Sequence, residues 1–86
     1  MIIVSQDKEE IVNFDKVESI WIDSDEEGRF TIEATADTNS TLGYYKTKER
    51  AKEVLQEIIE IYREEIIHGS SGYFSSTKTV YDMPED

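Results

Sequence analysis

The chain has 86 residues, and 20 acidic against 9 basic side chains give it a formal charge of −11 at pH 7. A chain of this size and charge is expected to form one small domain that repels nucleic acid and anionic membrane surfaces and attracts basic proteins. It contains no cysteine, which excludes disulfides, thiolate catalysis and cysteine-ligated zinc and favours a reducing cytoplasm.

Short alternating runs predict β-strands in the first half of the chain. The opening apolar run, residues 2–4, is too short for a signal peptide or a membrane span and is typical of a strand. In the best of the expected strands, Ile20 and Ile22 face one side and Trp21 faces the other. The expected strands are residues 2–4, 11–14, 17–23, 29–36 and 41–45.

A long amphipathic helix is expected next. Thr47 is a good N-cap, and Gly69 follows the expected end of the helix near residue 67. The apolar residues of this segment cover an arc of about 160°, which is wide enough to pack on a sheet and leave a flank for a second surface. The expected fold is therefore α+β, with an antiparallel β-meander of about three to five strands packed against one amphipathic α-helix.

The sequence predicts one folded unit followed by a loop. Residues 1–68 form the expected domain of β-meander and helix. Residues 69–86 begin with GSSGYFSST, which is typical of a flexible loop, and continue with an expected edge strand at 77–81 and an acidic tail. The sequence leaves open whether this segment packs on its own domain or on a neighbour.

None of the common catalytic patterns occurs in the sequence. The single histidine, His68, lies at the expected helix end, where it most simply interacts with the last carbonyl groups. No serine lies in a Gly-x-Ser-x-Gly turn, and no nucleotide-binding glycine pattern is found. We therefore expect no enzyme activity, no catalytic residue, no metal and no cofactor.

The stretch DSDEEGRFTIEA, residues 23–34, partly matches a calcium-binding loop. Asp23, Asp25 and Gly28 fit three positions of an EF-hand loop. Glu33, however, comes one place too early, and on a strand it points to the opposite face. An acidic hairpin turn is the favoured interpretation.

Four glutamates form a row on the expected helix. Helical geometry places them within an arc of about 60° on the side away from the apolar arc. Such a row is typical of a solvated face, but it also resembles the charge pattern of a nucleic-acid backbone that a basic groove would bind. The predicted partner-binding residues are this row and the acidic turn: Glu53, Glu57, Glu60, Glu64, Asp23, Asp25, Glu26 and Glu27.

An opposite charge pattern lies in YYKTKERAK, residues 44–52. Helix N-termini attract phosphates and aromatic rings stack on bases, so a small anionic ligand such as a nucleotide is an alternative partner. The simpler interpretation is an exposed first turn that offsets nearby glutamate charge. The residues of this alternative ligand site are Tyr44, Tyr45, Lys46, Lys48 and Arg50.

Two stretches resemble a known group of proteins. MIIVSQDKEEIVNFDKVESIWID and LGYYKTKERAKEVLQEII are similar to small proteins encoded by phages and prophages of Gram-positive bacteria. The resemblance covers about residues 1–62 and implies a β-meander that ends in a helix, in a protein of the bacterial cytoplasm. It also implies a context, because small acidic phage proteins often inhibit host or defence proteins by resembling DNA or by sequestering nucleotides.

The functional expectation that follows is a non-enzymatic acidic protein-interaction module. It would be a phage-derived inhibitor whose partner is a basic, nucleic-acid-binding host or defence protein, with no direct nucleic-acid or membrane contact. One alternative is a nucleotide-binding or nucleotide-sequestering protein. Another is a structural component of a phage assembly, with a homo-oligomer formed through the Trp21 face or the helix flank.

Overall fold

The computed structural model describes residues 1–69 and 79–86. Within these residues the six strands and the α-helix follow the expected order, with shifts at their ends, and the short 3-10 helix at Phe14–Lys16 was not expected. Residues 70–78, which hold all of the expected loop 69–77 except Gly69 and include Tyr73 and Phe74, lie outside the described residues. The elements are β1 (Ile2–Val4), β2 (Ile11–Asn13), the 3-10 helix η1 (Phe14–Lys16), β3 (Ser19–Ser24), β4 (Phe30–Thr35), β5 (Asn39–Tyr45), α1 (Lys48–Gly69) and β6 (Val80–Asp82).

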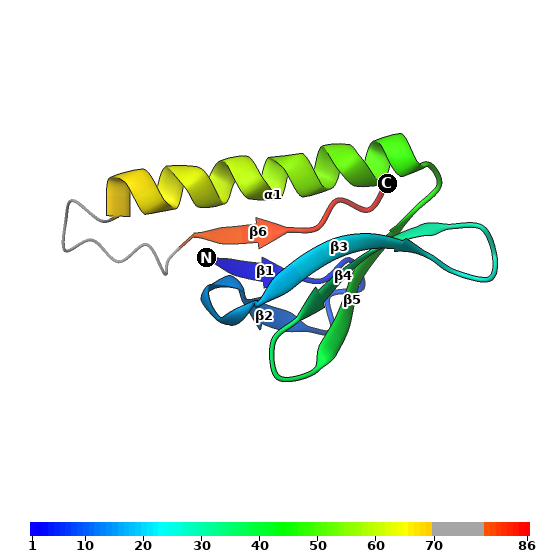
Figure 1. Ribbon diagram of the computed structural model, residues 1–86, viewed down its shortest axis with the longest axis horizontal. Helices are drawn as coiled ribbons and strands as arrows, with labels where there is room; N and C mark the ends of the chain where they lie inside the picture. The colour runs from blue at the N-terminus through cyan, green and yellow to red at the C-terminus, as the bar shows by residue number, and fades with distance from the viewer. Residues whose placement is uncertain (70–78) are drawn as a thin grey trace.

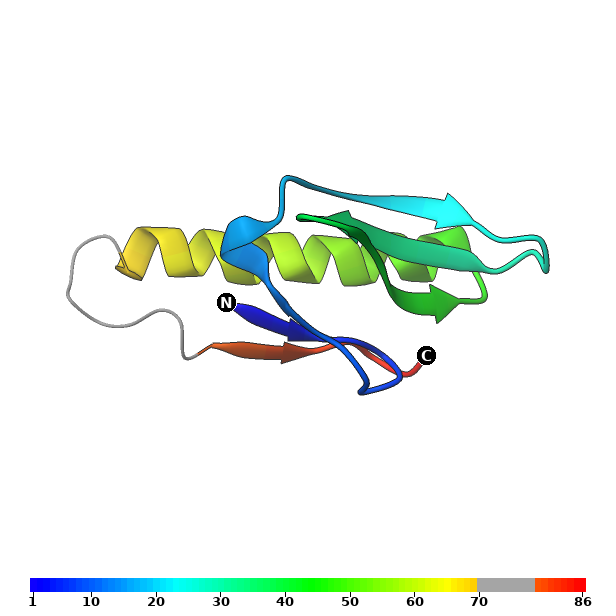
Figure 2. The ribbon, with the colours of Figure 1, turned by 90° about the horizontal axis from the view of Figure 1, so that it is seen from below.

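The fold belongs to the α+β class, as the sequence predicts. The described strands form two three-stranded sheets, in the orders β2-β1-β6 and β3-β4-β5. The second sheet is the expected antiparallel meander, whereas β6 pairs parallel to β1 in the first. The two strands of a parallel pair cannot be joined by a tight turn, and here every other element of the fold lies between β1 and β6 in the sequence. Figures 1 and 2 show α1 as one layer and the two sheets side by side as the other.

An irregularity in β5 connects the two sheets. Ile32 pairs with Gly43 but its neighbour Glu33 pairs with Thr41, so Leu42 is an extra residue in β5. Such a bulge leaves the extra residue without a partner on the neighbouring strand. The Leu42 carbonyl instead accepts a 2.8 Å hydrogen bond from the amide of Gln6, just after β1. The bulge therefore attaches the end of β1 to the meander.

The core lies between α1 and the inner faces of both sheets. The helix contributes its buried face to this core, and the ring of Phe14 packs edge-on against Tyr62 with ring centroids 4.9 Å apart. Ile20 and Ile22 are half-buried against the core, as the sequence predicts for the inner face of β3. The fully buried apolar residues are Met1, Ile3, Val12, Ile32, Ala34, Leu42, Tyr45, Ala51, Val54, Ile58, Tyr81 and Met83.

The expected N-cap of the helix is confirmed. The Thr47 hydroxyl oxygen accepts a 3.1 Å hydrogen bond from the Arg50 amide, and its carbonyl accepts one from Ala51. The first bond satisfies an amide of the first turn that the helix itself leaves unpaired, and the second is the first bond of the helical ladder. Within residues 1–69 and 79–86, no helix is both long and apolar enough to cross a membrane.

Residues 79–86 pack on the domain that precedes them. The amide of Ile2 donates to the carbonyl of Thr79 at 2.9 Å, and the amide of Met83 donates to the carbonyl of Val4 at 3.0 Å. Tyr81 and Met83 enter the core. The expected edge strand is therefore β6, which pairs with β1 in the first sheet.

Candidate functional site

The acidic row lies along α1, but its members differ in their contacts. Glu53 accepts a 3.1 Å hydrogen bond from Nη1 of Arg50, one turn earlier on the helix. Glu57 accepts a 2.6 Å hydrogen bond from the hydroxyl of Tyr81 in β6. The row therefore begins at an ion pair and passes beside the first sheet. All four carboxylates are on exposed residues: Glu53, Glu57, Glu60 and Glu64.

The contact between Tyr81 and Glu57 joins the row to the core. Burial raises the pKa of the Tyr81 hydroxyl far above its usual value, and the hydrogen bond to Glu57 raises it further. The hydroxyl therefore remains a donor at neutral pH and orients the Glu57 carboxylate. A partner that binds the row would meet this carboxylate in a set position.

The acidic turn between β3 and β4 is held together by its own carboxylate. Asp25 Oδ1 accepts hydrogen bonds from the amides of Glu27 and Arg29, at 3.0 and 2.8 Å. Its other oxygen lies 2.7 Å from Nε of Arg29, and Gly28 has the positive φ of 85° that the turn requires. Partial burial works to raise the pKa of Asp25, but the hydrogen bonds from Arg29 outweigh it and lower that pKa.

These bonds reduce the charge that the turn presents. Glu27 lies 3.4 Å from Nη2 of the same arginine, so Arg29 contacts two of the four carboxylates and offsets one unit of their charge. Asp23 accepts a 2.8 Å bond from the amide of Ser24, and Glu26 is exposed. Nowhere in the described part of the chain do three or more His, Cys, Asp or Glu side chains gather as metal ligands would. The turn is thus a hairpin connection held by Asp25 and Arg29, and it keeps a net negative charge.

A hollow of about 470 Å³ lies at the N-terminal end of α1. Four of the five residues predicted for the alternative ligand site line it, whereas Lys48 does not. Five other lining residues were not predicted, because they come from the β1–β2 connection, from the start of β4, from the helix cap and from the end of the sequence. The lining residues are Gln6, Arg29, Tyr44, Tyr45, Lys46, Thr47, Arg50, Glu85 and Asp86.

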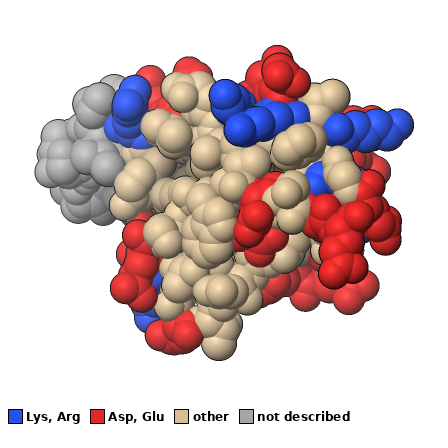
Figure 3. Space-filling model, turned by 45° about the vertical axis from the view of Figure 1, so that its right-hand side comes forward, with Lys and Arg blue, Asp and Glu red and all other residues tan. Residues whose placement is uncertain are grey.

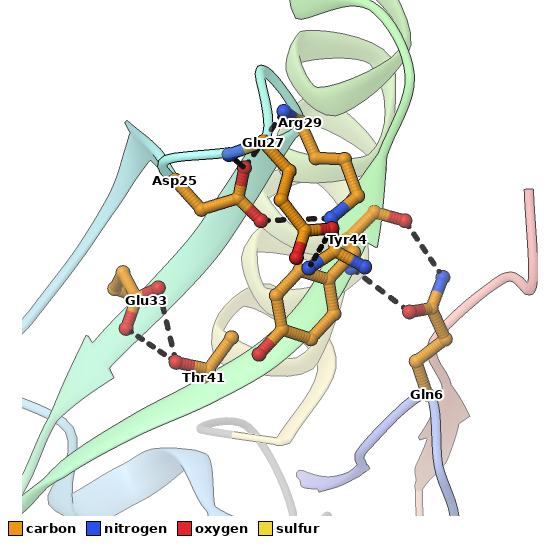
Figure 4. A network of polar contacts seen from close by, with 7 residues as sticks. All are labelled: Gln6, Asp25, Glu27, Arg29, Glu33, Thr41 and Tyr44. Carbon is orange, nitrogen blue, oxygen red and sulfur yellow. Dashed lines mark hydrogen bonds and ion pairs between the residues drawn. The ribbon is translucent and has the colours of Figure 1, made fainter.

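Figure 4 shows how Tyr44 is held at the wall of this hollow. The guanidinium carbon of Arg29 lies 4.4 Å from the centroid of the Tyr44 ring, within the range of a cation–π contact. Asp25 and Glu27 fix the guanidinium from its other side. The Tyr44 residue is still 42% exposed. The Tyr44 ring is therefore held in place by Arg29 and is still accessible to a ligand.

The side chain of Gln6 completes another part of the wall. Its Oε1 accepts from the Tyr44 amide at 2.9 Å and its Nε2 donates to the Tyr44 carbonyl at 3.0 Å, as a neighbouring strand would do (Figure 4). Tyr45 points inward instead, where it is 2% exposed and donates to the carbonyl of Pro84 at 2.9 Å. Tyr45 is thus a buried core residue that also forms part of the lining of the hollow.

Charges of both signs meet around this end of the molecule. Figure 3 shows basic side chains along the upper rim of this face and acidic side chains gathered at its right-hand side. Arg29, Lys46 and Arg50 line the hollow, and the acidic residues Glu85 and Asp86 line it too. The hollow is therefore a cationic site that the chain itself partly neutralises.

Comparison with known proteins identifies no relative. No protein-family model, no curated protein and no solved structure matches the chain. The functional argument therefore depends on the chemistry of these two surfaces, the acidic row and the hollow.

Proposed function

We propose that the protein is a non-enzymatic acidic interaction module that binds a basic protein surface through the row on α1. The observation that carries the proposal is an exposed line of carboxylates on a rigid helix, in a chain with a formal charge of −11. The resemblance to phage and prophage proteins favours one form of this function. In that form the protein inhibits a nucleic-acid-binding host or defence protein by occupying its basic groove.

The spacing of the row limits how closely it can match DNA. At a rise of about 1.5 Å per residue, the four glutamates are separated by about 6, 4.5 and 6 Å along the helix axis. The phosphates of one DNA strand recur about every 3.4 Å along the duplex axis. The row is therefore sparser than a DNA strand and resembles a short run of phosphates. The proposed contact is electrostatic and should weaken as salt increases.

Charge reversal with a matched control tests this proposal. The row variant carries Glu53→Lys, Glu60→Lys and Glu64→Lys and keeps Glu57, because that carboxylate is bonded to Tyr81. The control variant carries three reversals at exposed acidic residues away from α1, so that its net charge changes equally. These are Glu9→Lys, Glu18→Lys and Asp37→Lys.

Each protein is immobilised and exposed to lysate of a Gram-positive bacterium, and retained proteins are quantified. Wild type and the control should retain the same basic protein, and the row variant should lose it by more than tenfold. Circular dichroism must show that all three chains are folded. If the row variant and the control retain the same proteins in equal amounts, the row is only a solvated face.

A further inference from the structure

The hollow at the N-terminal end of α1 holds the chain's own residues 84–86 by their main-chain oxygens. The Pro84 carbonyl accepts from the hydroxyl of Tyr45 at 2.9 Å and from Nε2 of Gln6 at 3.1 Å. The Glu85 carbonyl accepts from the same Nε2 at 2.9 Å. These three residues are therefore bound in the manner of a peptide ligand, and they are called the strap below.

Arg50 holds the last of these oxygens. Its Nε donates to the main-chain oxygen of Asp86 at 2.7 Å, while its Nη1 donates to Glu53. A guanidinium forms its strongest contacts with carboxylate or phosphate oxygens, which accept two parallel hydrogen bonds. The strap thus occupies the edge of Arg50 that an anionic ligand would use.

The groups that hold the strap are fixed before anything binds. Gln6 is bonded to both main-chain groups of Tyr44, and the Tyr45 ring is buried. Gly43 allows that ring to lie where it does, because a Cβ at position 43 would be 2.8 Å from the Tyr45 hydroxyl oxygen. Donors that need no rearrangement favour binding, because their ordering cost is already met in folding.

Size and composition indicate what else would fit. A volume of about 470 Å³ lies in the range of small-ligand sites, about 300–1,000 Å³. Three cationic side chains line the hollow, and since Arg29 is already paired with Asp25 and Glu27, Lys46 and Arg50 are the two that would meet a phosphate group. The exposed ring of Tyr44 offers a surface for stacking a planar base. Glu85 and Asp86 would repel such a ligand while the strap is in place.

We propose that this hollow is a binding site for a phosphate-bearing ligand with a planar ring, of nucleotide size, and that the strap must leave Arg50 before the ligand binds. None of the four glutamates of the acidic row lines the hollow, and the two sites share only the contact between Glu53 and Arg50. When a strap competes in this way, the apparent affinity equals the affinity of the open site multiplied by the fraction of molecules in which the strap is open.

Titrations followed by nuclear magnetic resonance on the full ¹⁵N-labelled chain test the site. The probes are adenosine diphosphate, inorganic pyrophosphate and adenosine, added at constant ionic strength. Adenosine diphosphate should shift the amide signals of Tyr44, Arg50 and Glu85 together, and pyrophosphate should bind more weakly. Arg50→Gln should weaken binding at least tenfold, whereas Lys52→Gln, at an exposed position outside the hollow, should change it less than twofold.

Two variants test the strap separately. Gln6→Met removes two hydrogen bonds of the strap, together with the two bonds between Gln6 and the Tyr44 main chain, and should tighten binding of adenosine diphosphate by about tenfold. Gln56→Met, the same substitution at an exposed helix position, is its control. The double variant Glu85→Gln with Asp86→Asn keeps the chain length, removes the repulsion and should tighten binding several-fold.

The outcomes separate the parts of the proposal. If no probe shifts the amides that line the hollow in wild type, Gln6→Met or the double variant, the site is overturned. Equal binding of pyrophosphate and adenosine diphosphate overturns the role of the planar ring. Unchanged or weaker binding in both folded strap variants overturns the competition. The retention experiment on the acidic row is a separate measurement, and neither of its outcomes changes how these titrations are interpreted.

Discussion

Ionisation of Tyr45 should couple the stability of the fold to alkaline pH. Burial raises the pKa of its hydroxyl from the usual 10 to about 12. Because the folded-state pKa is the higher one, this contribution to stability is complete below pH 10 and is lost as the pH rises toward 12. Each unit of difference corresponds to about 1.4 kcal/mol, so the full loss is about 2.7 kcal/mol.

The Tyr45→Phe variant isolates this effect. Near pH 8 it should be less stable than wild type by about 0.5–1.5 kcal/mol, because the hydrogen bond to Pro84 is lost. Near pH 11.5 wild type has lost about 2 kcal/mol through this hydroxyl, and the variant has no hydroxyl to ionise. The order of stability should therefore reverse. Urea unfolding followed by the fluorescence of Trp21 measures both differences.

The control is Val54→Ala, a buried substitution without an ionisable group. Its cost should be the same at both pH values, since wild type and this variant keep Tyr45 and Tyr81. If the difference between wild type and Tyr45→Phe also stays constant from pH 8 to pH 11.5, Tyr45 ionises with its usual pKa in the folded protein. That result would refute the reasoning from burial.

Three further substitutions test the packing and the helix cap. Ile58→Ala empties a fully buried position and should lower the free energy of unfolding by about 2–5 kcal/mol in urea; a loss under 1 kcal/mol would place Ile58 outside the core. Gly43→Ala should cost about 1–3 kcal/mol by the same measurement, and less in a Tyr45→Phe chain, because its Cβ would lie 2.8 Å from the Tyr45 hydroxyl oxygen. Thr47→Ala removes the N-cap and should cost about 1 kcal/mol in a thermal melt, whereas an unchanged melting temperature would show that the cap contributes nothing.

Local patterns were sufficient to locate the elements but not to arrange them. Alternation of apolar and polar residues predicts β4, and the apolar spacing with Thr47 predicts α1, because both depend on neighbours in the sequence. The connection between the two sheets depends on the bulge at Leu42 and on its bond to Gln6, a contact between segments far apart in the chain. No short-range pattern marks such a contact.

The candidate sites show the same limit. Four lining residues were predicted together because they lie in one short stretch of the sequence: Tyr44, Tyr45, Lys46 and Arg50. Gln6, Arg29 and the strap join them only through tertiary packing. The row of glutamates follows from helical periodicity alone, whereas the bond from Tyr81 to Glu57 requires the parallel pairing of β6 with β1.

That parallel pairing also affects when the fold can form during synthesis. Ile3 pairs with Tyr81, so the first sheet needs strands from near both ends of the 86-residue sequence. Contacts between such distant residues slow folding, because the entropy of closing the loop is lost before the contact is gained. During synthesis on the ribosome, the first sheet cannot be completed until β6 has been made. The meander and the early turns of α1 could already assemble by then. Until β6 has been synthesised and has paired with β1, the inner side of β1, including Ile3, would stay open to chaperones or to another chain.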